Sequence, residues 1–295
     1  MRILVTGHKG FIGRNLCAYL QHQGHQVEGW EWQINKVPDP QNYDRVVHLG
    51  AISSTTERDV EKILKQNLEF STRLLQLCNQ TGTTLIYASS ASVYGNVQVD
   101  KDLKQIKESD PVYPMSPYSW SKYLFDKLMM EVPEYTINVQ GLRLFNVYGP
   151  GEQDKGEQQS VFGKFELQAK NLKKITLFEK SGFIRRDFIW VGDVCQIIEK
   201  MFDVDATDIW NVGTGVAPSF LDIAEGYAEK YGAEIEYVPL PEHLKGQYQF
   251  FTCADNSKLI NSIGPYKFKT VKEYIDASKT SVSYTHLTLP TIVSV

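Results

Sequence analysis

The stretch Thr6-Gly7-His8-Lys9-Gly10-Phe11-Ile12-Gly13 decides the fold of this 295-residue chain. The apolar residues 3–6 precede it, and the helix-like residues 14–23 follow it. In such a strand-turn-helix, the first glycine allows a tight turn, the second admits a pyrophosphate, and the third lets helix and strand pack closely. The N-terminus of the helix adds partial positive charge for the phosphates. The stretch predicts a dinucleotide-binding turn; the alternative is a glycine-rich turn without a ligand.

The chain around this turn alternates short apolar segments with longer segments of helical period, which is typical of parallel β-α-β units. Predicted strands are residues 3–6, 26–30, 45–49, 84–88 and 136–142. The clearest helix is residues 60–78, where apolar side chains recur every three or four positions. After about residue 150 the pattern changes, and helices are predicted at 160–172 and 219–231. We expect an α/β fold: a Rossmann-type doubly wound parallel sheet with a smaller, interleaved mixed α/β substrate domain.

Composition excludes several other classes of protein. The 31 Lys and Arg residues face 35 Asp and Glu residues, for a net charge of −4, so a nucleic-acid partner is not expected. The four cysteines, Cys17, Cys78, Cys195 and Cys253, lie far apart and predict neither a metal site nor a disulfide framework. The sequence shows no signal peptide and no long apolar span, so we expect a cytoplasmic protein without a membrane partner.

The last fifteen residues, 281–295 (SVSYTHLTLPTIVSV), carry no charged residue other than His286 and no helical period. We interpret them as a non-native tail; the alternative is an edge strand.

Tyr118 and Lys122 stand four residues apart and share one face of a helix that we predict to begin near Tyr118. A free tyrosine has a pKa near 10 and would have to fall by about three units, or about 4 kcal/mol, to act as a base near neutrality. An ammonium about 4 Å away contributes roughly that much at an effective dielectric constant of about 20. We therefore expect Lys122 to lower the pKa of Tyr118. The alternative is an exposed Tyr-Lys pair without catalytic meaning.

Two further residues, Ser90 and Glu31, stand where an enzyme that uses a dinucleotide cofactor would bind its substrate and the cofactor ribose. Ser90, in the run Ala88-Ser89-Ser90-Ala91-Ser92-Val93-Tyr94-Gly95, follows a predicted strand and could bind a substrate oxygen at the carboxyl edge of the sheet. The alternative role for this run is to cap the next helix. Glu31 ends the second predicted strand, where a carboxylate can accept hydrogen bonds from the ribose of NAD and repel the 2′-phosphate of NADP. A solvated surface glutamate is its alternative, and nearby Lys36 weakens the preference for NAD.

Together these motifs resemble those of extended short-chain dehydrogenase/reductases that act on nucleotide sugars. The resemblance spans residues 1 to about 278 and includes the runs 48–51 (HLGA), 144–150 (LFNVYGP) and 186–194 (RDFIWVGDV). It implies a dinucleotide-binding domain of residues 1–149 and 187–215 and a nucleotide-sugar-binding domain of residues 150–186 and 216–280. It implies NAD or NADP as cofactor, with NAD slightly favoured. The cofactor residues are then Gly7, Gly10, Phe11, Ile12, Gly13, Glu31, Leu49, Gly50, Ala51, Tyr118 and Lys122.

Within that family, three runs resemble those of the ADP-L-glycero-D-manno-heptose 6-epimerases: 50–57 (GAISSTTE), 144–156 (LFNVYGPGEQDKG) and 244–255 (LKGQYQFFTCAD). The resemblance implies a catalytic set of Ser90, Tyr118, Lys122 and Lys155, with Lys155 as the second acid/base; on sequence alone, Lys155 is an ordinary loop lysine. It further implies a substrate set of Ser90, Asn146, Lys155, Arg186 and Tyr248. Arg186 could equally be a structural partner near Asp187.

The implied reaction is epimerisation at C6 of the heptose through a transient ketone, with no net change in the cofactor. Ala91-Ser92 stand where related dehydratases typically carry an acidic residue, so dehydration is disfavoured. The alternatives are a UDP-hexose 4-epimerase and a non-catalytic NAD(P)-sensing protein. The resemblance also implies a homo-oligomer.

The segment 31–44 departs from the family pattern. A complete crossover needs about ten to twelve residues before any strand or connection is added, so this segment is too short for a helix and a further strand. We expect the sheet to lack one strand. The acidic residue that family members often use to contact adenine after that strand then has no counterpart.

Overall fold

The computed structural model describes residues 1–54, 56–95, 104–131, 135–152, 156, 159–240 and 250–277. Two predicted site residues, Lys155 and Tyr248, and the proposed tail 281–295 lie outside these described residues.

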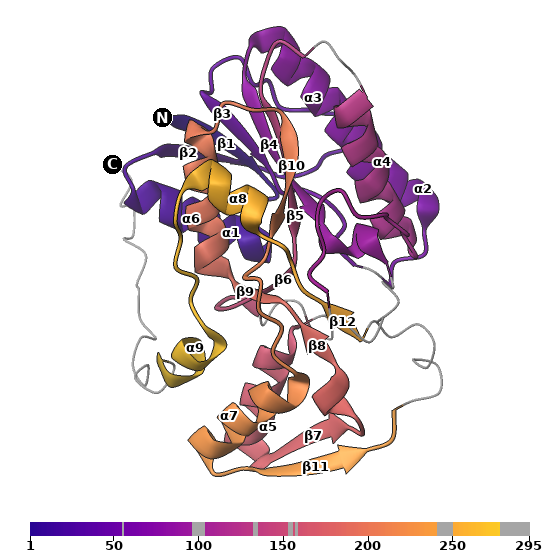
Figure 1. Ribbon diagram of the computed structural model, residues 1–295. Coiled ribbons are helices and arrows are strands. Elements are labelled where there is room, and N and C mark those ends of the chain that lie inside the picture. The colour runs from indigo at the N-terminus through magenta and orange to yellow at the C-terminus, as the bar shows by residue number, and fades with distance from the viewer. Residues whose placement is uncertain are drawn as a thin grey trace, which may run out of the picture.

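A six-stranded parallel sheet forms the centre of the larger lobe (Figure 1). Its order is β10-β5-β4-β3-β1-β2. The strands are β1 (Arg2–Thr6), β2 (Gln26–Trp30), β3 (Arg45–His48), β4 (Thr84–Ser90), β5 (Val139–Leu144) and β10 (Asp208–Val212). The chain leaves β1 for β2 on one side and continues with β3 on the other, so the strand order reverses between β1 and β3. This reversal is where open α/β sheets bind ligands, at the carboxyl ends of the strands.

The expected loss of one strand is confirmed for the described part of the chain, because there β2 is the last strand on its side of the sheet. Residues 31–44 connect β2 to β3 without a helix. They turn back through a bridge between Gln33 and Lys36, and Asn35 adopts a left-handed φ of 58°.

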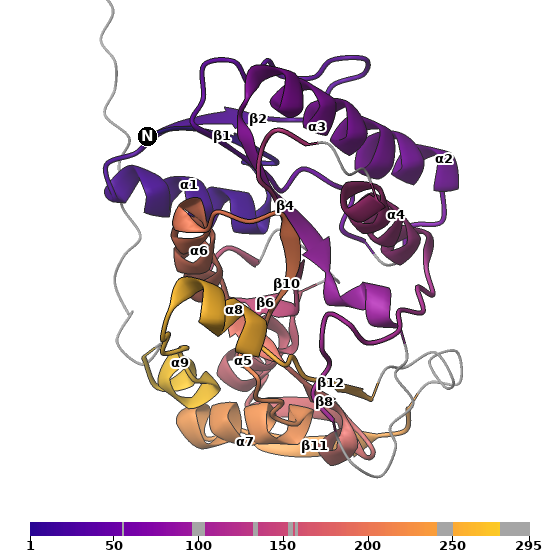
Figure 2. The ribbon, with the colours of Figure 1, turned by 45° about the horizontal axis from the view of Figure 1, so that its top comes forward.

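Helices cover both faces of the sheet, as Figure 2 shows. One layer contains α1 (Phe11–His22), α6 (Val191–Lys200) and α8 (Ser257–Ile263). The other contains α2 (Val60–Ile63), α3 (Phe70–Thr81) and α4 (Pro117–Glu131). The alternation of side chains along β1 explains this arrangement, because Ile3 and Val5 pack in the core with α1 and α6, whereas Leu4 packs with α3 and α4. Both faces of a parallel sheet must be covered in this way.

The predicted helix 60–78 runs from α2 into α3 but contains a π-helical stretch, η1 (Leu64–Glu69). A π-helical turn shifts the face that the following side chains present, and such turns are frequent at functional sites. Apolar periodicity predicted the helix but not this local widening.

The smaller lobe packs two helices against a two-stranded parallel sheet (Figure 1). It contains α5 (Val161–Leu172), β7 (Lys174–Phe178), α7 (Phe220–Tyr231) and β11 (Glu234–Val238), with α9 (Val271–Ala277) against α7. Ser219 and Asp222 cap α7 reciprocally, which fixes its first residue.

Short strand pairs join distant segments between the lobes: β6 (Asn146–Tyr148) with β9 (Phe188–Trp190), and β8 (Arg185–Arg186) with β12 (Phe251–Thr252). The short helices η2 (Ala91–Tyr94), η4 (Ser181–Phe183) and η5 (Met201–Asp203) complete the named elements. Among the described residues, no helix combines the length and the apolarity needed to cross a membrane.

Candidate active site

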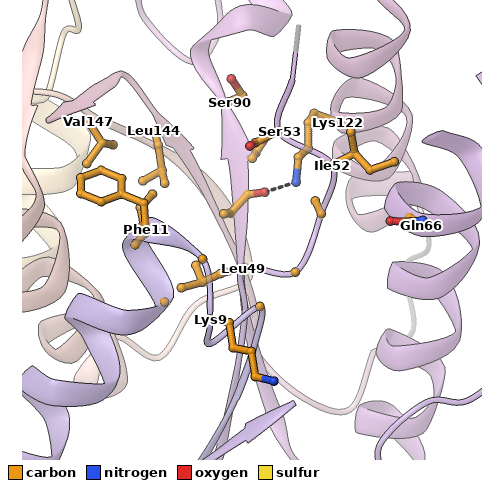
Figure 3. Close-up of a pocket in the computed structure, with 18 of the residues that line it drawn as sticks. Lys9, Phe11, Leu49, Ile52, Ser53, Gln66, Ser90, Lys122, Leu144 and Val147 are labelled. Carbon is orange, nitrogen blue, oxygen red and sulfur yellow. Dashed lines mark hydrogen bonds between the residues drawn. The ribbon is translucent and has the colours of Figure 1, made fainter. Parts of the chain in front are cut away.

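A cavity of about 760 Å³ opens at the carboxyl ends of β1, β3, β4 and β5 (Figure 3). In the figure, Phe11, Leu144 and Val147 form one side, while Ile52 and Gln66 lie on the opposite side. Every residue predicted to bind the cofactor lines this cavity, and so does Ser90. The volume lies within the range of small-molecule and cofactor sites.

The glycine-rich turn has the geometry that a pyrophosphate requires. Gly7 adopts a φ of 72°, and a Cβ there would stand 2.6 Å from Gly50 Cα, so neither the conformation nor the space suits a larger residue. A Cβ on Gly13 would overlap the carbonyl oxygen of Gly7. Helix α1 therefore begins against the turn, and its first residues line the cavity, where the N-terminus of a helix stabilises a phosphate.

Glu31 lies at the end of β2 beside this turn. Its Oε1 accepts a hydrogen bond of 2.7 Å from the backbone amide of Lys9 and lies 3.1 Å from His8 Nδ1. The His8 ring occupies the space where a Cβ of residue 29 would stand, so Gly29 makes room for it. These contacts hold the Glu31 carboxylate at the cavity wall, at the position from which a carboxylate can accept hydrogen bonds from the ribose.

Ser90 and Tyr118 meet at the other end of the cavity. Ser90 ends β4, and its Oγ accepts a 3.2 Å hydrogen bond from the Ser92 amide. The capping alternative is therefore realised, since Ser90 is the N-cap of η2. Ser90 also hydrogen-bonds the buried Tyr118. The Ser90 side chain thus caps η2 and also contacts Tyr118 in the cavity.

The expectation that Lys122 lowers the pKa of Tyr118 is wrong for this structure. Burial raises the pKa of Tyr118, and the hydrogen bond from Ser90 offsets only part of that increase. The Lys122 ammonium lies 6.0 Å from the centre of the Tyr118 ring and donates a 2.7 Å hydrogen bond to the carbonyl oxygen of Ala88 (Figure 3). Burial lowers the pKa of Lys122 itself to about 8, so near neutrality a fraction of it is uncharged. The expectation assumed an ammonium about 4 Å from the phenol and did not include the desolvation of both groups.

A buried ion pair that the sequence analysis missed lies one turn beyond Lys122. Asp126 accepts hydrogen bonds of 2.9 Å from Arg143 Nε and from the hydroxyl of Tyr87. Arg143 also donates a 2.9 Å bond to the Tyr94 hydroxyl. The negative charge of Asp126 favours the ammonium form of Lys122, which opposes the effect of burial. The four-residue spacing of Tyr118, Lys122 and Asp126 is the signal that could have found this pair.

Asn67 is a second missed residue, and it lies within η1. Its side chain exchanges two hydrogen bonds with the backbone of Ile52, of 2.8 and 3.0 Å, and donates a third of 3.0 Å to Ser121 Oγ on α4. Asn67 thereby joins the loop after β3 to the helix that carries Tyr118 and Lys122. A buried polar residue at an apolar position of the helical pattern was the available signal.

The predicted substrate residues are only partly brought together. Asn146 Nδ2 donates a 3.0 Å bond to the Asp187 carbonyl, and Arg186 lies next along the chain on β8. Neither of them lines the main cavity. The Asp187 carboxylate accepts hydrogen bonds from the amides of Thr214, Gly215 and Ala254 and from the Thr214 hydroxyl. Three backbone amides and one hydroxyl therefore satisfy this buried carboxylate.

Comparison with known proteins identifies the family. The sequence pattern of the NAD dependent epimerase/dehydratase family matches residues 3–213. The chain belongs to this family. Among solved structures, the chain is similar to the ADP-L-glycero-D-manno-heptose-6-epimerase of Helicobacter pylori, with 26% identity and a TM-score of 0.82, over 94% of each chain. It is also similar to the UDP-glucose 4-epimerase of Thermus thermophilus in complex with NAD, with 25% identity and a TM-score of 0.74, over 96% of this chain and 100% of the other.

The protein is therefore an NAD-dependent enzyme of the nucleotide-sugar epimerase/dehydratase type, built as an extended short-chain dehydrogenase/reductase. The cavity fits NAD, because its turn leaves no room for side chains at Gly7 and Gly13 and one helix N-terminus faces it. Bound NAD supplies reversible hydride transfer. The residues that would hold it are the glycine turn at the phosphates, Glu31 at the ribose, and Tyr118 with Lys122 at the nicotinamide end.

Proposed function

We propose that this enzyme converts ADP-D-glycero-D-manno-heptose to its L-glycero epimer by inverting C6 through a transient ketone. One observation carries the proposal: the Ser90–Tyr118 pair and the glycine turn lie at opposite ends of a single cavity. A sugar alcohol beside Tyr118 would then lie within reach of a bound nicotinamide. The specific sugar rests on the three sequence runs that resemble heptose epimerases and on the similarity to the Helicobacter pylori enzyme.

In this proposal Tyr118 moves the proton of the sugar hydroxyl. Its phenol is buried and hydrogen-bonded to Ser90, so it is protonated as it stands and must lose its proton before it can act as a base. Ser90 can donate to the phenolate or to the sugar oxygen, and the positive charge of the oxidised nicotinamide would favour the phenolate further. Lys122, held by Ala88, would orient the nicotinamide ribose.

Epimerisation presents hydroxyls on opposite sides of the same carbon, so a second proton-transfer group is useful. We propose Lys155 for this role on the strength of the family resemblance, and Arg186, Asn146 and Tyr248 for binding the diphosphate.

Epimerisation is favoured over dehydration by the residues that follow Ser90. Ala91 and Ser92 begin η2 directly after Ser90, which lines the cavity, and neither carries the carboxylate that would remove a proton from carbon.

The test is to incubate the purified enzyme and NAD separately with ADP-D-glycero-D-manno-heptose and with UDP-glucose, following the epimers by NMR. We expect the heptose alone to gain its epimer, without net NADH release. Conversion of UDP-glucose instead would identify a hexose 4-epimerase, and turnover of neither would overturn the heptose proposal in favour of another nucleotide sugar. In a second arm, Lys155→Met should abolish or bias turnover of one heptose epimer; unchanged rates in both directions would remove the two-base proposal.

A further inference from the structure

The missing strand leaves Trp32 at the edge of the cofactor cavity. Trp32 follows β2 by two residues, and residues 31–44, all of which the structure describes, add neither a helix nor a strand beyond it. The cavity wall on this side therefore comes from the turn itself, and Glu31 and Trp32 are its lining residues. A shorter connection has placed an indole where another strand would otherwise follow.

Trp32 is anchored and separates two hollows. It packs against the hydrophobic core on the α3 and α4 side of the sheet, as Val37 and Tyr43 also do. It lines the main cavity, and with Gln66 it also lines a second cavity of about 280 Å³. The two residues thus form a partition between the hollows. An indole held from behind in this way can present a face to a ligand at low entropic cost.

Hydrogen bonds hold the part of the cavity wall that Ile52 and Gln66 form. Ile52 lines the same cavity, and its backbone amide and carbonyl are both hydrogen-bonded to the Asn67 side chain, at 2.8 and 3.0 Å. Gln66 precedes Asn67 in η1, and Figure 3 shows it on the same side of the cavity as Ile52. The π-helical stretch therefore fixes the Ile52 loop with one residue and lines the cavity with the adjacent one.

The charged side chains of the second cavity already have partners within the protein. In the second cavity, Lys65 lies 2.7 Å from Glu61, and Asp59 accepts the 3.0 Å N-cap bond of the Lys62 amide. Lys62 pairs at 2.8 Å with Glu57. The charged side chains of the second cavity are therefore engaged in contacts within the protein, whereas Lys9 (Figure 3) lines the main cavity together with Glu31 and Trp32.

We propose that Trp32 binds the adenine of NAD by stacking, with Ile52 and the Gln66 amide as further lining residues around the base. The order of groups along the cavity assigns this place: Tyr118 marks the nicotinamide end, the glycine turn the phosphates, and Glu31 the ribose, so the base comes next to Trp32. In this proposal, stacking of adenine on the Trp32 indole takes the place of the contact between adenine and an acidic side chain that family members often use. The inference rests on NAD as the cofactor and is independent of which sugar is turned over.

The experiment measures binding of ADP-ribose, which contains the adenine half of NAD but no nicotinamide, by titration calorimetry. Trp32→Leu keeps an apolar side chain against the core but removes the aromatic face, whereas Trp32→Phe keeps a face. Stacking of a base on an aromatic ring is worth about 1–3 kcal/mol, so we expect Trp32→Leu to weaken ADP-ribose binding by about 5- to 150-fold. Trp32→Phe should retain most of the affinity.

Trp120→Leu is the matched control, because Trp120 is 48% exposed on α4 and contacts Tyr123 away from the cavity. Its ADP-ribose affinity should equal that of the wild type. Etheno-ADP-ribose supplies a spectroscopic readout, since its base fluorescence should be quenched on binding to the wild type and less so on binding to Trp32→Leu. Equal affinities of Trp32→Leu and Trp32→Phe, within about twofold, would overturn the proposal. Failure of the heptose proposal would appear only in the sugar assay, with ADP-ribose binding intact.

Discussion

Lys122 is a cation buried in the active site, and its replacement by methionine should change the pH dependence of stability. Burial lowers the pKa of Lys122 from 10.5 to about 8 in the folded protein. At about 1.4 kcal/mol per pH unit, this difference costs the folded state about 3 kcal/mol when the side chain is charged in both states. Between pH 8 and pH 10.5 the unfolded chain binds more protons than the folded one at this site, so the cost disappears as pH rises. About 2 kcal/mol of it should be recovered between about pH 7.5 and pH 10.

The assay is urea unfolding of the wild type and Lys122→Met at several pH values in this range. The stability of the wild type relative to the variant should rise by about 2 kcal/mol from about pH 7.5 to pH 10. The buried cysteines and tyrosines, whose pKa values burial raises, oppose this trend in each protein but cancel in the difference. Loss of the hydrogen bond to Ala88 shifts the variant by a constant amount and leaves the slope unchanged.

Lys127→Met is the control, because Lys127 lies on the same helix with half of its side chain exposed beside Glu131. Its curve should run parallel to that of the wild type. Parallel curves for Lys122→Met and the wild type across this range would refute the assignment of Lys122 as a desolvated cation.

Three further predictions concern the same site. Gly13→Ala should destabilise the protein by about 1–3 kcal/mol and abolish ADP-ribose binding, because its Cβ would overlap the Gly7 carbonyl. The control Gly182→Ala, whose Cβ would stand 3.6 Å from Leu221, should show neither effect when the variants are compared by thermal melts and calorimetry. Tyr118→Phe should lower the rate of epimer formation by about 10²- to 10⁴-fold in the NMR assay while ADP-ribose binding stays as in the wild type; near-normal turnover would contradict its role as the base. Asp126→Asn should cost about 3–5 kcal/mol in urea unfolding, because it leaves Arg143 buried without its counter-charge, and a loss below about 1 kcal/mol would show that the pair is not buried as described.

Local chemistry in the sequence predicted much of the cofactor half. The glycine spacing identified the turn because only residues without a Cβ fit where β1, α1 and the Gly50 loop approach one another. The limits of β2 agreed with the predicted residues 26–30, and the absence of a strand after it followed from chain length alone. Strand β5 was placed less well, at 136–142 in place of Val139–Leu144, because a strand buried on both faces has no alternating pattern to fix its ends.

By itself, the sequence determined the type of fold, the place of the phosphates and the residue types able to move a proton, since these depend on spacing along a strand, a turn or one helix face. Only the tertiary structure decided the pKa values and the hydrogen-bond partners of those residues. Burial raises the pKa of Tyr118 and lowers that of Lys122, and the Ala88 carbonyl takes the ammonium. Desolvation and hydrogen bonding depend on which distant segments enclose a group, and no local spacing records them.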